Sequence, residues 1–169
     1  MVDVIPKRSG LWLGVERYGP LGFSLAAMVG IYLNATPIVT SIEASKWQVA
    51  NLYTAVFSWA AIQTGFAFGV YGFVVGRSEG FIPEIRNTIA MRRFLGYVKR
   101  ANVGGFLLTI VSLPLTIFSP NPAPQGSAQF FLVLLWFGLF LWTLLAFLRI
   151  AYSFGHLSSI RDQPAFYGA

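Results

Sequence analysis

Long uncharged stretches alternate with short charged ones along this chain. No Asp, Glu, Lys or Arg occurs between Trp47 and Gly76, and none occurs between Ala101 and Leu148. A helix that crosses a bilayer needs about 20 largely apolar residues. Each stretch is therefore long enough to contain a membrane span, and the second is too long for a single one.

The pattern predicts four spanning helices. Ser119–Ser127 divides the second stretch, because its three prolines and one glycine forbid a continuous helix there. Another apolar run covers about Tyr18–Val39 and is interrupted only by Ser24, Asn34 and Thr36. The predicted helices cover about residues 18–39, 47–76, 101–118 and 128–152.

The composition also indicates a membrane protein. Of the 169 residues, 56% are hydrophobic and only 11% are charged, and the mean hydropathy is +0.64; a soluble domain is about 25% charged. We therefore predict an all-α integral membrane protein in which residues 1–169 form a single four-helix domain. Glu16 and Arg17 interrupt the apolar stretch that follows Lys7 and Arg8, so we expect the N-terminus to be retained rather than cleaved.

The cations are distributed unequally between the two sides of the predicted bundle. Of the 12 Lys and Arg residues, only Lys46 lies in a loop on the opposite side from the rest. Cationic loops stay in the cytoplasm, so both termini are predicted to be cytoplasmic, in a bacterial inner membrane or an equivalent energy-transducing membrane. This topology explains most of the net charge of +6, and we therefore expect no nucleic-acid partner.

A short amphipathic basic helix is predicted between the second and third spans, over residues 87–100. Its apolar side is expected to lie in the membrane interface. Its basic side would anchor the topology, or bind a lipid head group or an acidic partner. The basic side consists of Arg92, Arg93, Lys99 and Arg100.

The second span carries a stripe of small and polar residues at steps of three or four. At about 100° per residue they fall within an arc of roughly 80°, and glycines at such spacing let helix backbones approach closely. The stripe is typical of a helix-packing surface, within the bundle or between protomers, and a polar pore lining is the alternative. Its members are Asn51, Thr54, Ser58, Ala61, Gly65, Gly69, Gly72 and Gly76, with a looser counterpart of Gly22, Ala26 and Gly30 on the first span.

Two amides are expected to be buried in the spans. Gln63 lies on the other side of the second span from the stripe, and Asn34 lies on the first span. An unpaired amide in hydrocarbon costs several kcal/mol, so each should have a hydrogen-bond partner. The interpretation favoured here is fixation of helix register, with contact to a substrate or an ion as the alternative.

The fourth span combines many aromatic residues with a polar group at its cytoplasmic end. The aromatic side chains surround the helix, which suits contact with lipid or a hydrophobic partner. Arg149, Tyr152 and His156 share one helix face. They are candidates for binding an anionic ligand, although Arg and Tyr at a membrane boundary commonly serve as anchors.

The sequence offers few residues that could carry out catalysis. The chain has no cysteine and one histidine, which excludes an iron–sulfur cluster, a Cys-zinc site and bis-His haem within it. We expect a non-enzymatic subunit that assembles through its small-residue faces, with itself or with other membrane subunits, among membrane lipids. The alternatives are an oligomeric pore or membrane-disrupting effector, and a lipid- or cofactor-binding membrane protein.

Overall fold

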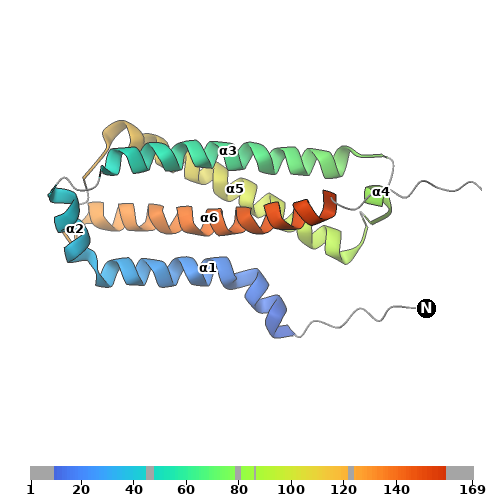
Figure 1. Cartoon of the computed structure of the whole chain (residues 1–169), viewed down its shortest axis with the longest axis horizontal. Coiled ribbons are helices and arrows are strands. Elements are labelled where there is room, and N and C mark those ends of the chain that lie inside the picture. The colour runs from blue at the N-terminus through green and yellow to red at the C-terminus, as the bar shows by residue number, and fades with distance from the viewer. Residues whose placement is uncertain (1–9, 45–47, 79–80, 86, 122–123, 159–169) are drawn as a thin grey trace, which may run out of the picture.

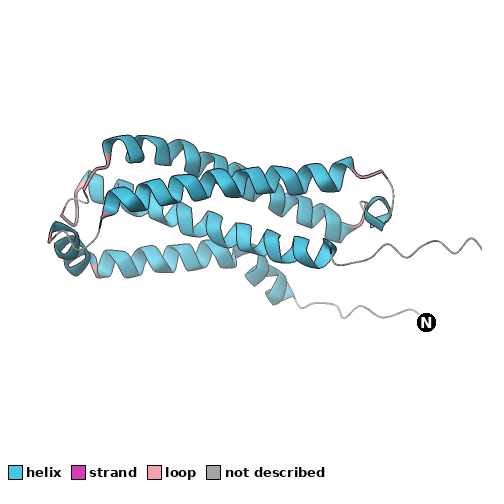
Figure 2. Cartoon of the chain, turned by 45° about the horizontal axis from the view of Figure 1, so that its top comes forward, coloured by secondary structure: helices cyan, strands magenta, loops and turns pink. Residues whose placement is uncertain are grey.

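The computed structural model describes residues 10–44, 48–78, 81–85, 87–121 and 124–158, and all regular structure in these ranges is helical. Loops in the described ranges lie at the two ends of a bundle of long helices (Figure 2). Lys7, Arg8, Lys46, Arg86 and Arg161, on which part of the charge prediction rests, lie outside these ranges. The helices are α1 (Gly10–Leu33), α2 (Ala35–Glu43), α3 (Val49–Gly76), α4 (Phe81–Ile85), α5 (Ile89–Phe118) and α6 (Ala128–Ser158) (Figure 1).

The long helices have the length and composition of membrane spans. α3, α5 and α6 each satisfy both criteria, and α1 with α2 would supply a fourth, broken span. Only 28–33% of the most apolar part of α3, α5 and α6 is buried inside the chain. Large apolar side chains on the outside of the bundle, such as Leu33 and Phe118, are more than 70% exposed. A bundle with this surface is an integral membrane protein, because water would not tolerate so much exposed hydrocarbon.

The first predicted helix is wrong in one respect, because it breaks at Asn34. α1 ends at Leu33, and α2 continues at an angle of 69° to it. Pro37 has no N–H, and in an unbroken helix its ring would collide with the carbonyl of Leu33. In the observed structure Pro37 lies in the first turn of α2, where a missing N–H costs nothing. The helix therefore bends at Asn34 instead of running straight to Val39.

The prediction of a separate basic helix is also wrong. α5 runs without interruption from Ile89 to Phe118, so the basic segment and the third span form one helix. Thr88 caps it by accepting a hydrogen bond from the backbone N–H of Met91 at 3.2 Å. Lys99 and Arg100 interrupt the hydropathy of the segment but not its helical conformation, because both are good helix formers. The boundaries of α3 and α6 differ from prediction by shorter amounts, α6 extending to Ser158.

α6 is the central helix of the bundle. It packs against α1, α5 and α3, whereas α3 packs chiefly against α5, and Figure 1 shows α6 between α1 and α3. Trp136, Ala146 and Ile150 on α6 are buried. The sequence interpretation assigned α6 to contact with lipid or a hydrophobic partner. A helix that is apolar all round suits either lipid or a protein interior, and the aromatic rings of α6 fill the space between its three neighbours.

One end of the bundle carries the described cations of the helices. The first residues of α1 and α5 and the last residues of α3 and α6 meet at this end, next to α4 (Figure 1). Arg77 follows α3 directly, four cations lie within the first twelve residues of α5, and Arg149 lies near the end of α6. The opposite end is formed by α2, the start of α3 and the loop between α5 and α6.

Candidate functional site

The small-residue stripe of α3 lies on the outside of the bundle. All eight of its members are exposed. The buried residues of α3 form a separate face that packs on α5 and α6, and that face is centred roughly 180° from the stripe at about 100° per residue. The buried set is Tyr53, Val56, Ala60, Gln63, Ala67, Val70 and Val74. The stripe therefore makes no helix contact within the described chain.

The glycines of the stripe have open space beside them. A Cβ built on Gly65, Gly69, Gly72 or Gly76 would meet no atom within 4 Å. The counterpart on α1 is similar, because Gly22, Ala26 and Gly30 are exposed and a Cβ on either glycine would also meet nothing. Of the two packing alternatives, contact within the bundle is wrong for the described residues, and contact between protomers or subunits remains.

The close helix approaches inside the chain use other glycines. A Cβ on Gly105 would lie 2.5 Å from Thr64 Oγ1 of α3, and one on Gly104 would lie 2.9 Å from the Thr143 methyl of α6. α5 thus fits between α3 and α6 through this pair. Sequence reasoning missed the pair, although two adjacent glycines in an apolar run signal a close approach on two sides.

α1 and α6 meet at a third overlooked glycine. A Cβ on Gly138 would overlap the Met28 side chain, so a larger residue there would require that flexible side chain to move. The hydroxyl of Ser24 donates to the Gly138 carbonyl at 2.6 Å, and both residues are buried. This hydrogen bond joins α1 to the central helix α6.

The two amides singled out in the sequence have different surroundings. Gln63 is 1% exposed, as predicted, yet neither its Nε2 nor its Oε1 has a hydrogen-bond partner in the described residues. Asn34 is exposed rather than buried, and its Nδ2 donates to the Gly30 carbonyl at 2.8 Å. The correction follows from the helix break, because Asn34 sits at the bend, where its side-chain amide and its backbone N–H both donate to the Gly30 carbonyl.

The basic side of α5 faces outward. Its four cations are exposed, and Arg92 also donates to the Asn87 carbonyl at 3.1 Å. The apolar side is covered by the protein itself: Met91 packs with Val74 of α3 and Ile82 of α4. This contact corrects the expectation that the apolar side enters the membrane interface, because α3, α4 and α6 already bury it.

The three polar residues near the C-terminal end of α6 do not share one set of contacts. The Arg149 guanidinium lies over the Tyr97 ring of α5, 3.6 Å from the ring centroid. A stacked cation of this kind stabilises the contact between α5 and α6. Tyr152 and His156 instead contact one another edge to face, with centroids 4.4 Å apart, and both are exposed.

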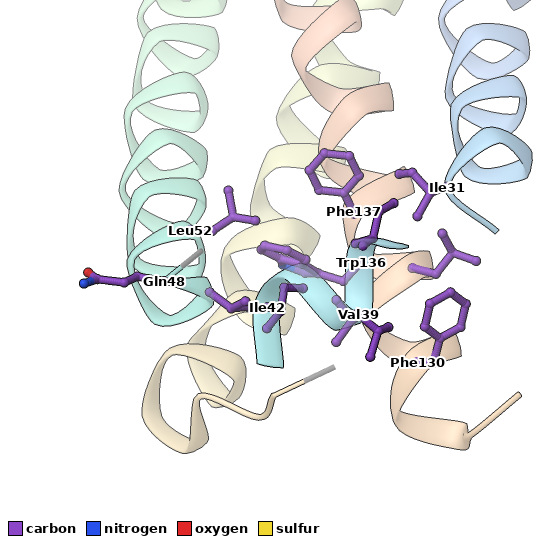
Figure 3. Close-up of a pocket in the computed structure, with 12 residues that line it drawn as sticks. Ile31, Val39, Ile42, Gln48, Leu52, Phe130, Trp136 and Phe137 are labelled. Carbon is purple, nitrogen blue, oxygen red and sulfur yellow. The ribbon is translucent and has the colours of Figure 1, made fainter. Parts of the chain in front are cut away.

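A cavity lies at the end of the bundle opposite the basic end. Its volume is about 490 Å³ and it is partly open. α6 forms its floor, α1 and α3 its sides, and α2 crosses one end (Figure 3). The lining residues are Ile31, Ile38, Val39, Ile42, Gln48, Val49, Leu52, Phe130, Val133, Leu134, Trp136 and Phe137.

The described residues contain no group of three or more His, Asp or Glu side chains that could hold a metal ion. Comparison of the chain with protein-family models, with curated proteins and with solved structures finds no match. The function is therefore argued from the surfaces and the cavity of this chain alone.

Proposed function

We propose that this protein is a non-enzymatic subunit of a membrane assembly, with both termini on the cytoplasmic side and four passes through the bilayer. The outward stripe of α3 is the contact surface in this proposal. The observation that carries it is the position of the stripe: eight small or polar residues along the whole helix, all exposed and opposite the buried face.

The chemistry of the stripe favours a protein neighbour over lipid. Asn51 and Ser58 lie on the outer face of a candidate span, where polar side chains facing hydrocarbon are unfavourable. Along the rest of the stripe, the four glycines have open space beside them, and the large side chain of Phe68 next to them is exposed. A partner helix packed on these glycines gains dispersion contacts that lipid chains make less well, and it offers hydrogen bonds to the polar end.

The charge distribution supports the orientation. The described cations gather at the end where α1 begins and α6 ends, and cationic ends of membrane proteins remain in the cytoplasm. The exposed cations of α5 would then lie at the cytoplasmic surface, available to anionic lipid head groups.

The test is the mass of the complex extracted from native membranes in mild detergent. We expect the unaltered chain to run as an assembly, with copies of itself or with other subunits. We expect the pair Gly69→Ile and Gly72→Ile to release the monomer, because each side chain fills open space on the contact surface without touching the fold. The matched control is Gly96→Ile with Gly155→Ile, which adds the same side chains at open positions on α5 and α6.

A chain that is monomeric in every mild detergent contradicts the proposal. So does an assembly that survives the α3 pair unchanged. Because the chain has no cysteine, Ser58→Cys gives an independent readout in intact membranes. Two copies facing one another through the stripe would form a disulfide-linked dimer, whereas Leu135→Cys, on exposed α6 surface, would not.

An oligomeric pore is the second candidate function, and one observation favours it. Asn51, Thr54 and Ser58 are polar, exposed and adjacent on the same face, so a ring of protomers would present them to one another at one end of the spans. Purified protein in liposomes would then conduct ions or release a trapped dye, and Ser58→Leu would reduce the flux. Sealed liposomes under all voltages would rule out this candidate and leave the subunit proposal standing.

A further inference from the structure

The cavity beside α2 has an interior without polar groups. Gln48 is the one amide in its lining, and its side chain points away from the cavity (Figure 3), where its Oε1 accepts a hydrogen bond from Asn51. The Trp136 indole N–H is also engaged elsewhere, donating to Ser112 Oγ at 2.8 Å. A buried water needs two to four polar partners. The cavity therefore does not suit water or any polar molecule.

The size of the cavity selects among apolar occupants. Its walls on α6 run from Phe130 to Phe137, about 10 Å at 1.5 Å per residue. The cavity volume of about 490 Å³ falls in the range of about 300–1,000 Å³ typical of small-ligand pockets. A slender, flexible apolar chain matches this volume and length.

The position of the cavity indicates where such a chain comes from. It lies at one end of the candidate spans, and its depth of about 10 Å is within one leaflet of a hydrocarbon core about 30 Å thick. α2 turns 69° away from α1 and places Ile38, Val39 and Ile42 over the cavity. Its Thr40 and Glu43 are exposed on the helix. α2 thus has the arrangement of a helix at the membrane interface.

We propose that this cavity binds one acyl chain of a membrane phospholipid, taken from the leaflet opposite the basic end of the bundle. The chain lies along α6 against the Trp136 and Phe137 rings, between α1 and α3. α2 covers the point where the head group remains at the interface. The Trp136 ring is held in place, because its indole N–H donates a hydrogen bond to Ser112 and the ring packs edge to face on Tyr53 with centroids 5.1 Å apart.

The test uses the full chain in lipid nanodiscs that contain a small fraction of phosphatidylcholine with a photoreactive diazirine on one acyl chain. After illumination, the labelled positions are mapped by peptide mass spectrometry. We expect Leu52 and Val133 to carry at least fivefold more label than the lipid-facing Leu132 and Leu135. Exposure alone predicts the reverse, because Leu132 and Leu135 are more exposed than either cavity residue. Labelling that simply follows exposure would overturn the proposal.

Filling the cavity should remove the label. Val133→Trp narrows it from α6, and Leu52→Trp narrows it from α3, so a fold defect in one variant leaves the other as a test. Leu135→Trp is the matched control, on the same helix about 200° around from position 133 and 63% exposed. We expect at least a fivefold loss in each cavity variant and none in the control. Equal labelling in folded cavity and control variants refutes the assignment.

Competition identifies the source of the chain. Unlabelled phosphatidylcholine should reduce the cavity label only in proportion to its mole fraction. If oleic acid or a long isoprenoid alcohol abolishes the label at a mole fraction of a few per cent, the site belongs to a free chain and the phospholipid assignment is wrong. The outcome for Val133→Trp is independent of the subunit proposal, because position 133 lies on α6, whereas the proposed contact surface lies on α3.

Discussion

The packing of α5 against its neighbours predicts that a Gly→Ala substitution has opposite effects on stability at two positions of this helix, 96 and 105. A Cβ on Gly96 would meet nothing within 4 Å, whereas one on Gly105 would lie 2.5 Å from Thr64 Oγ1 and 2.8 Å from Gln63 Nε2. Nonbonded heavy atoms prefer about 3.5–4.0 Å. The Thr64 hydroxyl also donates to the Ala60 carbonyl at 2.7 Å, so it cannot turn aside without losing that bond.

The magnitude follows from two terms. Replacing Gly by Ala in a helix raises its stability by up to about 1 kcal/mol, and this gain is common to both sites. Adding a methyl to a packed interior costs about 1–3 kcal/mol, and only Gly105 meets that cost. The free energies of unfolding of Gly96→Ala and Gly105→Ala should therefore differ by about 1–3 kcal/mol, with Gly96→Ala the more stable.

The assay is unfolding in mixed micelles with rising dodecyl sulfate, followed by circular dichroism. Adding Thr64→Ala to Gly105→Ala removes the nearest atom, and the double variant should recover part of the loss, with a coupling energy of about 0.5–3 kcal/mol. If Gly105→Ala is as stable as Gly96→Ala, the close approach of α3 and α5 is not the contact described here. If the effects of Gly105→Ala and Thr64→Ala on the free energy of unfolding are additive in the double variant, the added methyl group does not clash with Thr64.

Two further predictions concern the buried polar groups and use the same unfolding assay. Gln63→Leu should raise the free energy of unfolding by about 1–3 kcal/mol, because the amide is buried without a partner and leucine removes that cost; a fall in stability would show that the amide has a partner after all. Trp136→Phe should lower it by about 1–2 kcal/mol through loss of the 2.8 Å bond to Ser112. Adding Ser112→Ala should then cost little more, and a full second loss would contradict a shared bond.

The failures that concern which neighbours a helix meets have one physical origin. Hydropathy measures the preference of each segment for hydrocarbon, and lipid and protein interior satisfy that preference equally well. The aromatic residues of α6 therefore indicated lipid contact as readily as the central position they occupy. Gln63 was expected to have a partner, but whether a partner exists depends on neighbours from another helix. The pair Gly104–Gly105 was visible in the sequence, and only the approach of α3 and α6 shows why it is there.

What the sequence determined by itself was local. The absence of charge over two long stretches specified α3, α5 and α6, because a helix inserts in a bilayer on its own composition. The three-four spacing from Asn51 to Gly76 specified a continuous small face. Tertiary structure decided which way that face points, since the orientation of a helix depends on what its other side packs against. It also created the cavity, because the bend at Asn34 places α2 over a space that no single segment contains.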